Sequence, residues 1–334
     1  MSKHIKDTDY LAISARIRAM EGSLLTRERM EQILEARSDE DAAKLLHECG
    51  YPELDASRPE AMDAALSAAR EAVLEDLAGG APDPRYIDLF KLKYDYHNVK
   101  ALLKAAAVGA DPSHMLMDMG RVSTAVLREA LETGHLEELP DLLAQAVEEA
   151  REVLDTTRDP QLSDIVLDRW TYREMTQLAG DTGSAFLLGY VRTQIDAANL
   201  RTLIRVARMG KSGEFLRGVL LSGGEVPPES MEKAGAAGAA GITELYAPTR
   251  FQAAAEAGAQ ALQGGPLTEF ERLCDDAVAD YLDTARYVPF GEAPLIGYLA
   301  ARETEYTNLR ILLMGRSMGL DPDVIRSRLR AGCV

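Results

Sequence analysis

The sequence predicts an all-α fold, and three observations support this class. The composition is 46% hydrophobic but only 6% aromatic, with one Trp in 334 residues, a mix that favours helices over sheets. Helix start and stop signals recur along the chain, whereas the alternating pattern of a half-buried strand is nearly absent. A helical motif also occurs three times.

The first helix signals lie in the N-terminal quarter of the chain. Ser38 and Asp41 form a capping-box pattern before an apolar run, and Gly50 provides a stop signal. Ser57 and Glu60 repeat this pattern before a longer run that is expected to close at the glycines of positions 79–80.

Asp-Pro pairs mark further helix starts. Asp83-Pro84 is predicted to begin a helix that extends to about Val108 and ends at Gly109. Asp111-Pro112 and Asp321-Pro322 are predicted to begin the helices that follow. The segment at 233–242, KAGAAGAAGI, is interpreted as a loop or a tight contact between Ala/Gly-rich helices.

The repeated motif organises the chain. Its copies are DYHNVKALLKAAAVGADP (95–112), DAANLRTLIRVARMGKSG (196–213) and EYTNLRILLMGRSMGLDP (305–322). The copies begin 101 and 109 residues apart. This spacing exceeds the roughly 34 to 47 residues of common helical repeats. It therefore predicts a pseudo-threefold body of three helical repeats, at 1–115, 116–214 and 215–334.

Each motif copy places an acid, an Asn and a base at fixed positions on one helix. With about 100° per residue, the acid falls inside the apolar stripe, the Asn at its edge and the base on the far flank. A buried acid is costly unless it is paired or hydrogen-bonded, so we expect each set to join its helix to an adjacent repeat. The alternative is three solvated charged groups beside three amphipathic helices. The predicted structural or partner-binding residues are Asp95, Asn98, Lys100, Asp196, Asn199, Arg201, Glu305, Asn308 and Arg310.

Several functional classes are poorly supported. The net charge of −17 argues against nucleic-acid binding, which depends on basic surfaces. The sequence MGKSG at 209–213 lacks the glycine that a phosphate-binding loop requires five residues before its GK; position 205 is Arg. The five histidines show no metal-ligand spacing, and the three cysteines show no CxxC pair. We therefore expect no catalytic residues, no metal and no cofactor.

The sequence also gives an expectation about location. The N-terminal residues lack the apolar region of a signal peptide, and the apolar runs are shorter than the roughly 18 residues of a membrane helix. The spacing of the cysteines suits a reducing compartment. We expect a soluble cytoplasmic protein.

The three motif copies together resemble the C-type central-stalk component of V-type and archaeal or bacterial A-type ATP synthases, whose counterpart in vacuolar ATPases is the d component. Two further segments carry the resemblance: YLAISARIRAMEGSLL at 10–25 and YVPFGEAPLIGYL at 287–299. The middle copy departs from the pattern, because Lys211-Ser212 stands where the other copies have Asp-Pro.

The resemblance implies a funnel-shaped, all-helical body of three lobes and a non-catalytic rotor subunit. A protein of this family links a central shaft of D and F subunits to the proteolipid ring, and transmits torque for ion transport. It lies on the cytoplasmic face of the membrane, which it contacts only through the ring. Its partners include no nucleic acid.

Two other functions stay open at this point. One is an independent α-helical scaffold that binds other soluble proteins. The other is an enzyme of the isoprenoid type, in which the acidic segment DDAVAD would hold Mg²⁺ through Asp275, Asp276 and Asp280.

Overall fold

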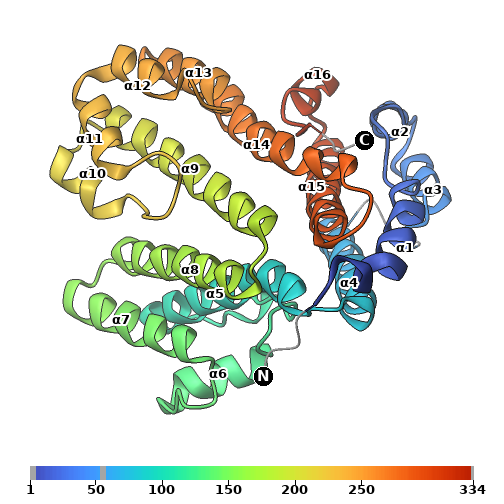
Figure 1. The fold of residues 1–334 in the computed structure, drawn as a ribbon, viewed down its shortest axis with the longest axis horizontal. Coiled ribbons are helices and arrows are strands. Elements are labelled where there is room, and N and C mark those ends of the chain that lie inside the picture. Colours follow the sequence, from blue (N-terminus) through green and yellow to red (C-terminus); the bar gives the residue numbers. More distant parts are fainter. Residues whose placement is uncertain (1–4, 53–57, 332–334) are drawn as a thin grey trace. The chain divides into compact units, whose positions relative to one another are not determined.

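The computed structural model describes residues 5–52 and 58–331, and in these ranges it contains helices and no strand (Figure 1). The all-α prediction is confirmed. None of the helices in these ranges has the length and apolar character needed to cross a bilayer.

The helices differ greatly in length, and the three motif copies lie on three of the longest: α5 (Arg85–Val108), α9 (Ala185–Arg208) and α15 (Glu292–Ser317). The others are α1 (Leu11–Glu21), α2 (Arg27–Leu34), α3 (Asp39–Glu48), α4 (Pro59–Gly80), α6 (Thr124–Thr133), α7 (Asp141–Thr157), α8 (Pro160–Thr182), α10 (Gly213–Val219), α11 (Pro228–Ala236), α12 (Gly238–Tyr246), α13 (Gln252–Leu262), α14 (Thr268–Asp283) and α16 (Pro322–Arg326). Short 3-10 helices are η1 (Asp7–Tyr10), η2 (Ser113–Met115) and η3 (Thr284–Tyr287).

Most of the predicted helix signals are confirmed. The Ser38 hydroxyl accepts a hydrogen bond from the Asp41 amide and caps α3. Helix α5 follows Pro84 and ends at Gly109, which has φ 67° and thus the left-handed conformation that glycine tolerates. Asp321 likewise caps α16. Ser57 lies outside the described residues; α4 begins at Pro59 and runs through both expected stop glycines.

The helix predicted to begin at Asp111-Pro112 is wrong. The Asp111 side chain accepts hydrogen bonds from the Ser113 amide and hydroxyl, and only the short 3-10 helix η2 follows. The next α-helix is α6, which begins at Thr124 with Ser123 as its cap. A local turn around an aspartate side chain therefore replaces the first helical turn.

The chain divides into two compact units. One comprises Asp83–Ile195 and Leu221–Gly223. In its core, Val99, Leu102 and Leu103 of α5 pack among apolar residues of α6, α7 and α8. These α5 residues belong to the apolar stripe predicted from the first motif copy.

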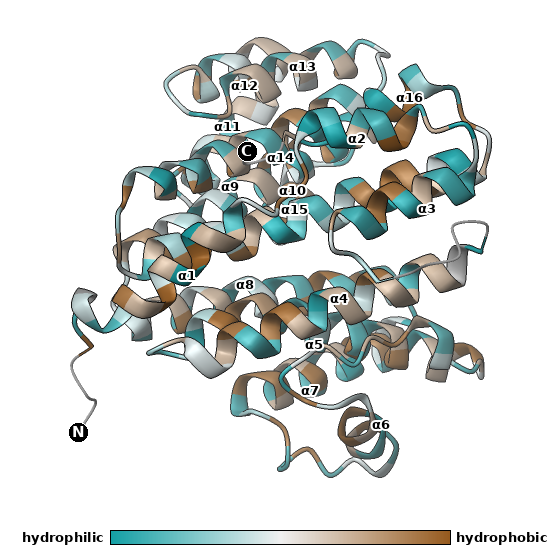
Figure 2. Cartoon of the chain, turned by 90° about the vertical axis from the view of Figure 1, so that its right-hand side faces the viewer, coloured by the Kyte–Doolittle hydropathy of each residue, from teal (hydrophilic) through white to brown (hydrophobic). Residues whose placement is uncertain are grey.

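The other unit comprises Met1–Pro82, Asp196–Leu220 and Gly224–Val334. In one of its cores, Leu309, Leu312 and Leu313 of α15 pack among apolar residues of α2, α3, α4 and α16. The last motif helix is therefore covered by helices from the N-terminal end of the chain. In Figure 2, helices such as α3 and α4 carry both hydrophobic and hydrophilic residues, as amphipathic packing requires.

The same unit contains the C-terminal part of α9 with α10 to α14. The alanine- and glycine-rich segment at 233–242 forms the end of α11 and the start of α12. A Cβ atom at Gly241 would lie 2.6 Å from the Ala237 Cβ, so this segment is a tight helix contact, as one interpretation expected. The three-repeat boundaries near 115 and 214 stay a prediction.

Candidate functional site

The three motif acids are buried, with exposed fractions of 0% for Asp95, 2% for Asp196 and 3% for Glu305. Each carboxylate accepts a hydrogen bond from at least one backbone amide of a loop that precedes another helix. We call each acid, its motif Asn and the backbone they bind a clamp, and number the clamps by their motif copies: first, middle and third.

The first clamp holds the loop that leads into α6. Asp95 accepts hydrogen bonds from the amides of Arg121 (2.9 Å) and Val122 (3.2 Å). Asn98 exchanges two hydrogen bonds with the Met117 backbone, at 2.8 and 2.9 Å. The Arg121 guanidinium also binds Asp95, with 2.7 Å between Nε and the carboxylate.

A second buried acid extends this first clamp. Glu174 of α8 accepts hydrogen bonds from the Arg121 guanidinium (2.7 Å) and from the Tyr96 hydroxyl (2.8 Å). Burial raises the pKa of Asp95, and the adjacent Arg121 charge opposes this effect. The buried charges are therefore paired and hydrogen-bonded, as their location requires.

The third clamp holds a loop near the opposite end of the chain. Glu305 accepts a hydrogen bond of 2.6 Å from the amide of Leu25, which is 280 residues away in sequence. The Tyr51 hydroxyl and the Arg302 guanidinium also donate to this carboxylate. Asn308 exchanges hydrogen bonds of 3.1 and 2.8 Å with the Arg330 backbone.

The middle clamp has the same kind of backbone contacts but lacks the arginine. Asp196 accepts hydrogen bonds from the amides of Glu225 (3.0 Å) and Val226 (3.1 Å). Asn199 is also buried. Within the described residues no lysine or arginine is paired with Asp196, and burial raises its pKa to about 6.

The clamped loops form a second repeated feature, which the sequence reasoning missed. Val122, Val226 and Leu25 each supply a clamped amide, and each comes directly before the cap of a helix: α6, α11 and α2 respectively. The available signal was a weak one: an apolar residue followed by Ser, Pro or Thr before a helical run, with glycine two residues earlier in two of the loops.

Each motif base forms an ion pair with an acid on another helix. Lys100 binds Asp168 of α8 at 2.6 Å, and Arg310 binds Asp63 of α4 at 2.9 Å. Arg201 binds two acids of α14, Glu271 and Asp275. Each partner helix is the α-helix that precedes a motif helix in sequence.

The acidic segment that resembled a magnesium motif is engaged in structural contacts. Asp275 binds both Arg201 and Arg330. Asp276 binds Arg272 at 2.5 Å and accepts a hydrogen bond from the Ala331 amide. No group of three His, Cys, Asp or Glu side chains suited to a metal ion occurs within residues 5–52 and 58–331.

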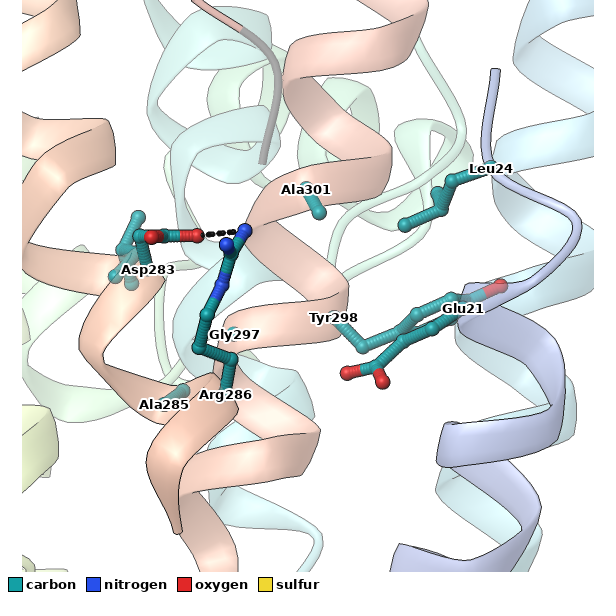
Figure 3. Close-up of a pocket in the computed structure, with 9 residues that line it drawn as sticks. Glu21, Leu24, Asp283, Ala285, Arg286, Gly297, Tyr298 and Ala301 are labelled. Atoms are coloured by element: carbon teal, nitrogen blue, oxygen red, sulfur yellow. Dashed lines mark ion pairs between the residues drawn. The ribbon is translucent and has the colours of Figure 1, made fainter. Parts of the chain in front are cut away.

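One cavity of about 300 Å³ lies between the end of α1, η3 and α15 (Figure 3). Its lining includes Glu21, Arg286 and Tyr298. Arg286 pairs with Asp283, and Glu21 pairs with Arg18 at 2.8 Å. Each charged side chain that lines this cavity is therefore already paired.

Comparison with known proteins gives a consistent result. The family model described as ATP synthase (C/AC39) subunit matches residues 13–328. The C component of the V-type sodium ATPase of Enterococcus hirae is 27% identical over 96% of this chain and 98% of its own length. The C component of the A-type ATP synthase of Methanocaldococcus jannaschii is 26% identical over 96% of this chain and 86% of its own. Its counterpart in Thermococcus kodakarensis is 25% identical over 96% and 90%.

The match therefore extends from α1 to just beyond α16 and includes all nine motif residues. In V/A-type ATPases the C/AC39 component is a non-catalytic accessory protein associated peripherally with the membrane. Because the family model covers nearly the whole sequence, the chain belongs to the C/AC39 family of ATP synthase subunits.

Proposed function

We propose that this protein is the rotor component that couples the central D/F shaft of a V/A-type ATPase to the proteolipid ring. It sits on the cytoplasmic face of the membrane, contacts the membrane only through the ring, and transmits torque between ATP turnover and ion transport. The observation that carries the proposal is the family match across residues 13–328.

The clamps support a mechanical role. A protein that transmits torque needs loops and helices that keep their relative positions under load. Hydrogen bonds from backbone amides to a buried carboxylate fix a loop more firmly than a solvated contact does, because water does not compete for the donors. The motif acids and asparagines would therefore stiffen each lobe, and the motif bases add ion pairs between helices.

Exposed apolar residues at equivalent motif positions support partner binding. The residue before the glycine that follows each motif helix is Val108, Met209 or Met318, and its exposed fraction is 76%, 54% or 69% respectively. Large apolar side chains left in water favour burial against another protein. We propose that these three helix ends contact partners within the ATPase.

A pull-down of the tagged protein from host membranes in mild detergent, analysed by mass spectrometry, tests the assignment. Recovery of the shaft subunits and the proteolipid ring is expected. Recovery of the protein alone, or with unrelated soluble partners, would overturn the assignment.

A triple variant tests the helix ends. Glutamate at Val108, Met209 and Met318 is expected to reduce co-recovery of the ATPase subunits without unfolding the protein. The control places glutamate at three exposed alanines, Ala64, Ala68 and Ala240, which adds the same charge elsewhere. Equal recovery with both variants would exclude the helix ends as contacts.

A further inference from the structure

The middle clamp differs from the others in one chemical respect. Asp95 and Glu305 each have an arginine on the carboxylate, whereas Asp196 accepts hydrogen bonds from two backbone amides and has no paired arginine within the described residues. The position of Arg121 in the first loop is occupied by Glu225 in the middle loop, so an acid replaces a base beside the buried carboxylate.

We propose that the middle clamp is a pH-sensitive latch, in which protonation of Asp196 holds the loop at Glu225 and Val226 closed and ionisation loosens it. An ionised carboxylate that is 2% exposed retains a desolvation cost that two amide donors offset only in part. A neutral carboxyl avoids this cost.

The groups that face Asp196 from the described elements around it add no compensating positive charge. Glu225 in the loop is negative, and its charge raises the pKa of Asp196 further. Tyr246 of α12 is fully buried, and its hydroxyl has no hydrogen-bond partner among the described residues. Cys274 of α14 is buried, and burial raises its pKa to about 12, so it is neutral. Arg250 lies over the Tyr281 ring, 5.1 Å from the ring centroid, and is not paired with Asp196.

The direction of the pH effect follows from linkage. The folded pKa of Asp196, about 6, lies above the unperturbed Asp value of about 3.9, so the closed state binds the proton more tightly than the open state. The contribution of this proton to stability is complete below about pH 4 and is lost as pH rises through about 6. With these two values, the opening equilibrium constant is expected to rise about tenfold between pH 5 and pH 8.

Hydrogen exchange of the full-length protein, followed by mass spectrometry on peptides that cover Glu225 and Val226, tests this latch. After correction for the intrinsic pH dependence of exchange, these amides are expected to exchange about tenfold faster at pH 8 than at pH 5. The Leu25 amide provides an internal reference and is expected to respond less, because Arg302 and Tyr51 bind its acceptor. If the corrected exchange rates of the Glu225 and Val226 amides are the same at pH 5 and pH 8, the proposal is overturned.

Three variants separate the latch from a general change in stability. Asp196→Asn removes the titrating group and is expected to abolish the pH response. Glu225→Arg supplies the base that Arg121 provides in the first clamp, and is expected to shift the response to lower pH. Glu225 is exposed, so this change leaves the core intact even where Asp196→Asn prevents folding. Tyr246→Phe is the control and should keep the response. An unchanged response in Glu225→Arg would contradict the proposal.

Discussion

The side-chain amide of Asn98 and the backbone of Met117 exchange two hydrogen bonds, 2.8 Å from Nδ2 to the carbonyl and 2.9 Å from the amide to Oδ1. The side-chain amide of Asn98 thus bonds to the Met117 backbone in the way that a second peptide group does in a β-sheet. Asn308 and Arg330 have the same relationship. This pairing requires both a donor and an acceptor, which explains an Asn at this motif position in chemical terms.

Replacing Asn98 by Leu is expected to destabilise the protein by about 2 kcal/mol, because the Met117 amide and carbonyl both lose a partner near the core. Thermal or denaturant unfolding measures the change. Lys100→Ala is a suitable control, since an ion pair at the surface contributes only about 0–1 kcal/mol. An equal loss of stability in the two variants would show that the hydrogen bonds of Asn98 contribute no more than the ion pair of Lys100 does.

Gly120→Ala is expected to open the first clamp. A Cβ atom at position 120 would lie 2.1 Å from Asp95 Oδ1, so either the loop or the carboxylate must move. The expected cost is at least about 2 kcal/mol, because the displaced carboxylate loses hydrogen bonds while it stays buried.

Gly180→Ala provides the matched control for this substitution. Position 180 lies in α8, and a Cβ there meets nothing within 4 Å. In a helix this change is expected to stabilise by about 0.5–1 kcal/mol. Opposite signs for the two variants in urea unfolding would support the clamp; a neutral Gly120→Ala would argue against it.

Removing Arg302 is expected to affect the third clamp strongly. Arg302→Met leaves the Glu305 carboxylate buried with its cation lost, which costs about 3–5 kcal/mol. Adding Glu305→Gln removes the unpaired charge and is expected to restore part of this loss. A double-mutant cycle on the free energy of unfolding measures the coupling, and strictly additive effects would exclude it.

Alkylation at pH 8 is expected to distinguish two cysteines. Burial raises the pKa of Cys274 to about 12, so only about one thiol in 10⁴ is ionised at this pH, and the side chain is fully buried. Cys49 is partly exposed. Iodoacetamide should therefore modify Cys49 in the native protein and Cys274 only in denaturant. Equal rates in the native state would show that α14 opens readily.

Much of the helical structure followed from local chemistry in the sequence. Ser38 and Asp321 cap helices where their spacing predicted, and Gly109 ends α5, because capping depends on residues within one helical turn. The burial of Asp95, Asp196 and Glu305 also followed from helical periodicity alone. At Asp111 a local turn competed with the helix and prevailed.

The partners of the motif residues were decided by tertiary structure. Glu305 binds the amide of Leu25 across 280 residues, and no local pattern indicates a contact between the two ends of a chain. The same holds for Arg310 and Asp63. Helical periodicity fixes which face of a helix is buried, so the sequence by itself determined that three acids lie inside. Which backbone groups and cations satisfy those acids depends on how helices distant in sequence pack, and only the folded structure decided that Asp196, among the described residues, has no arginine beside it.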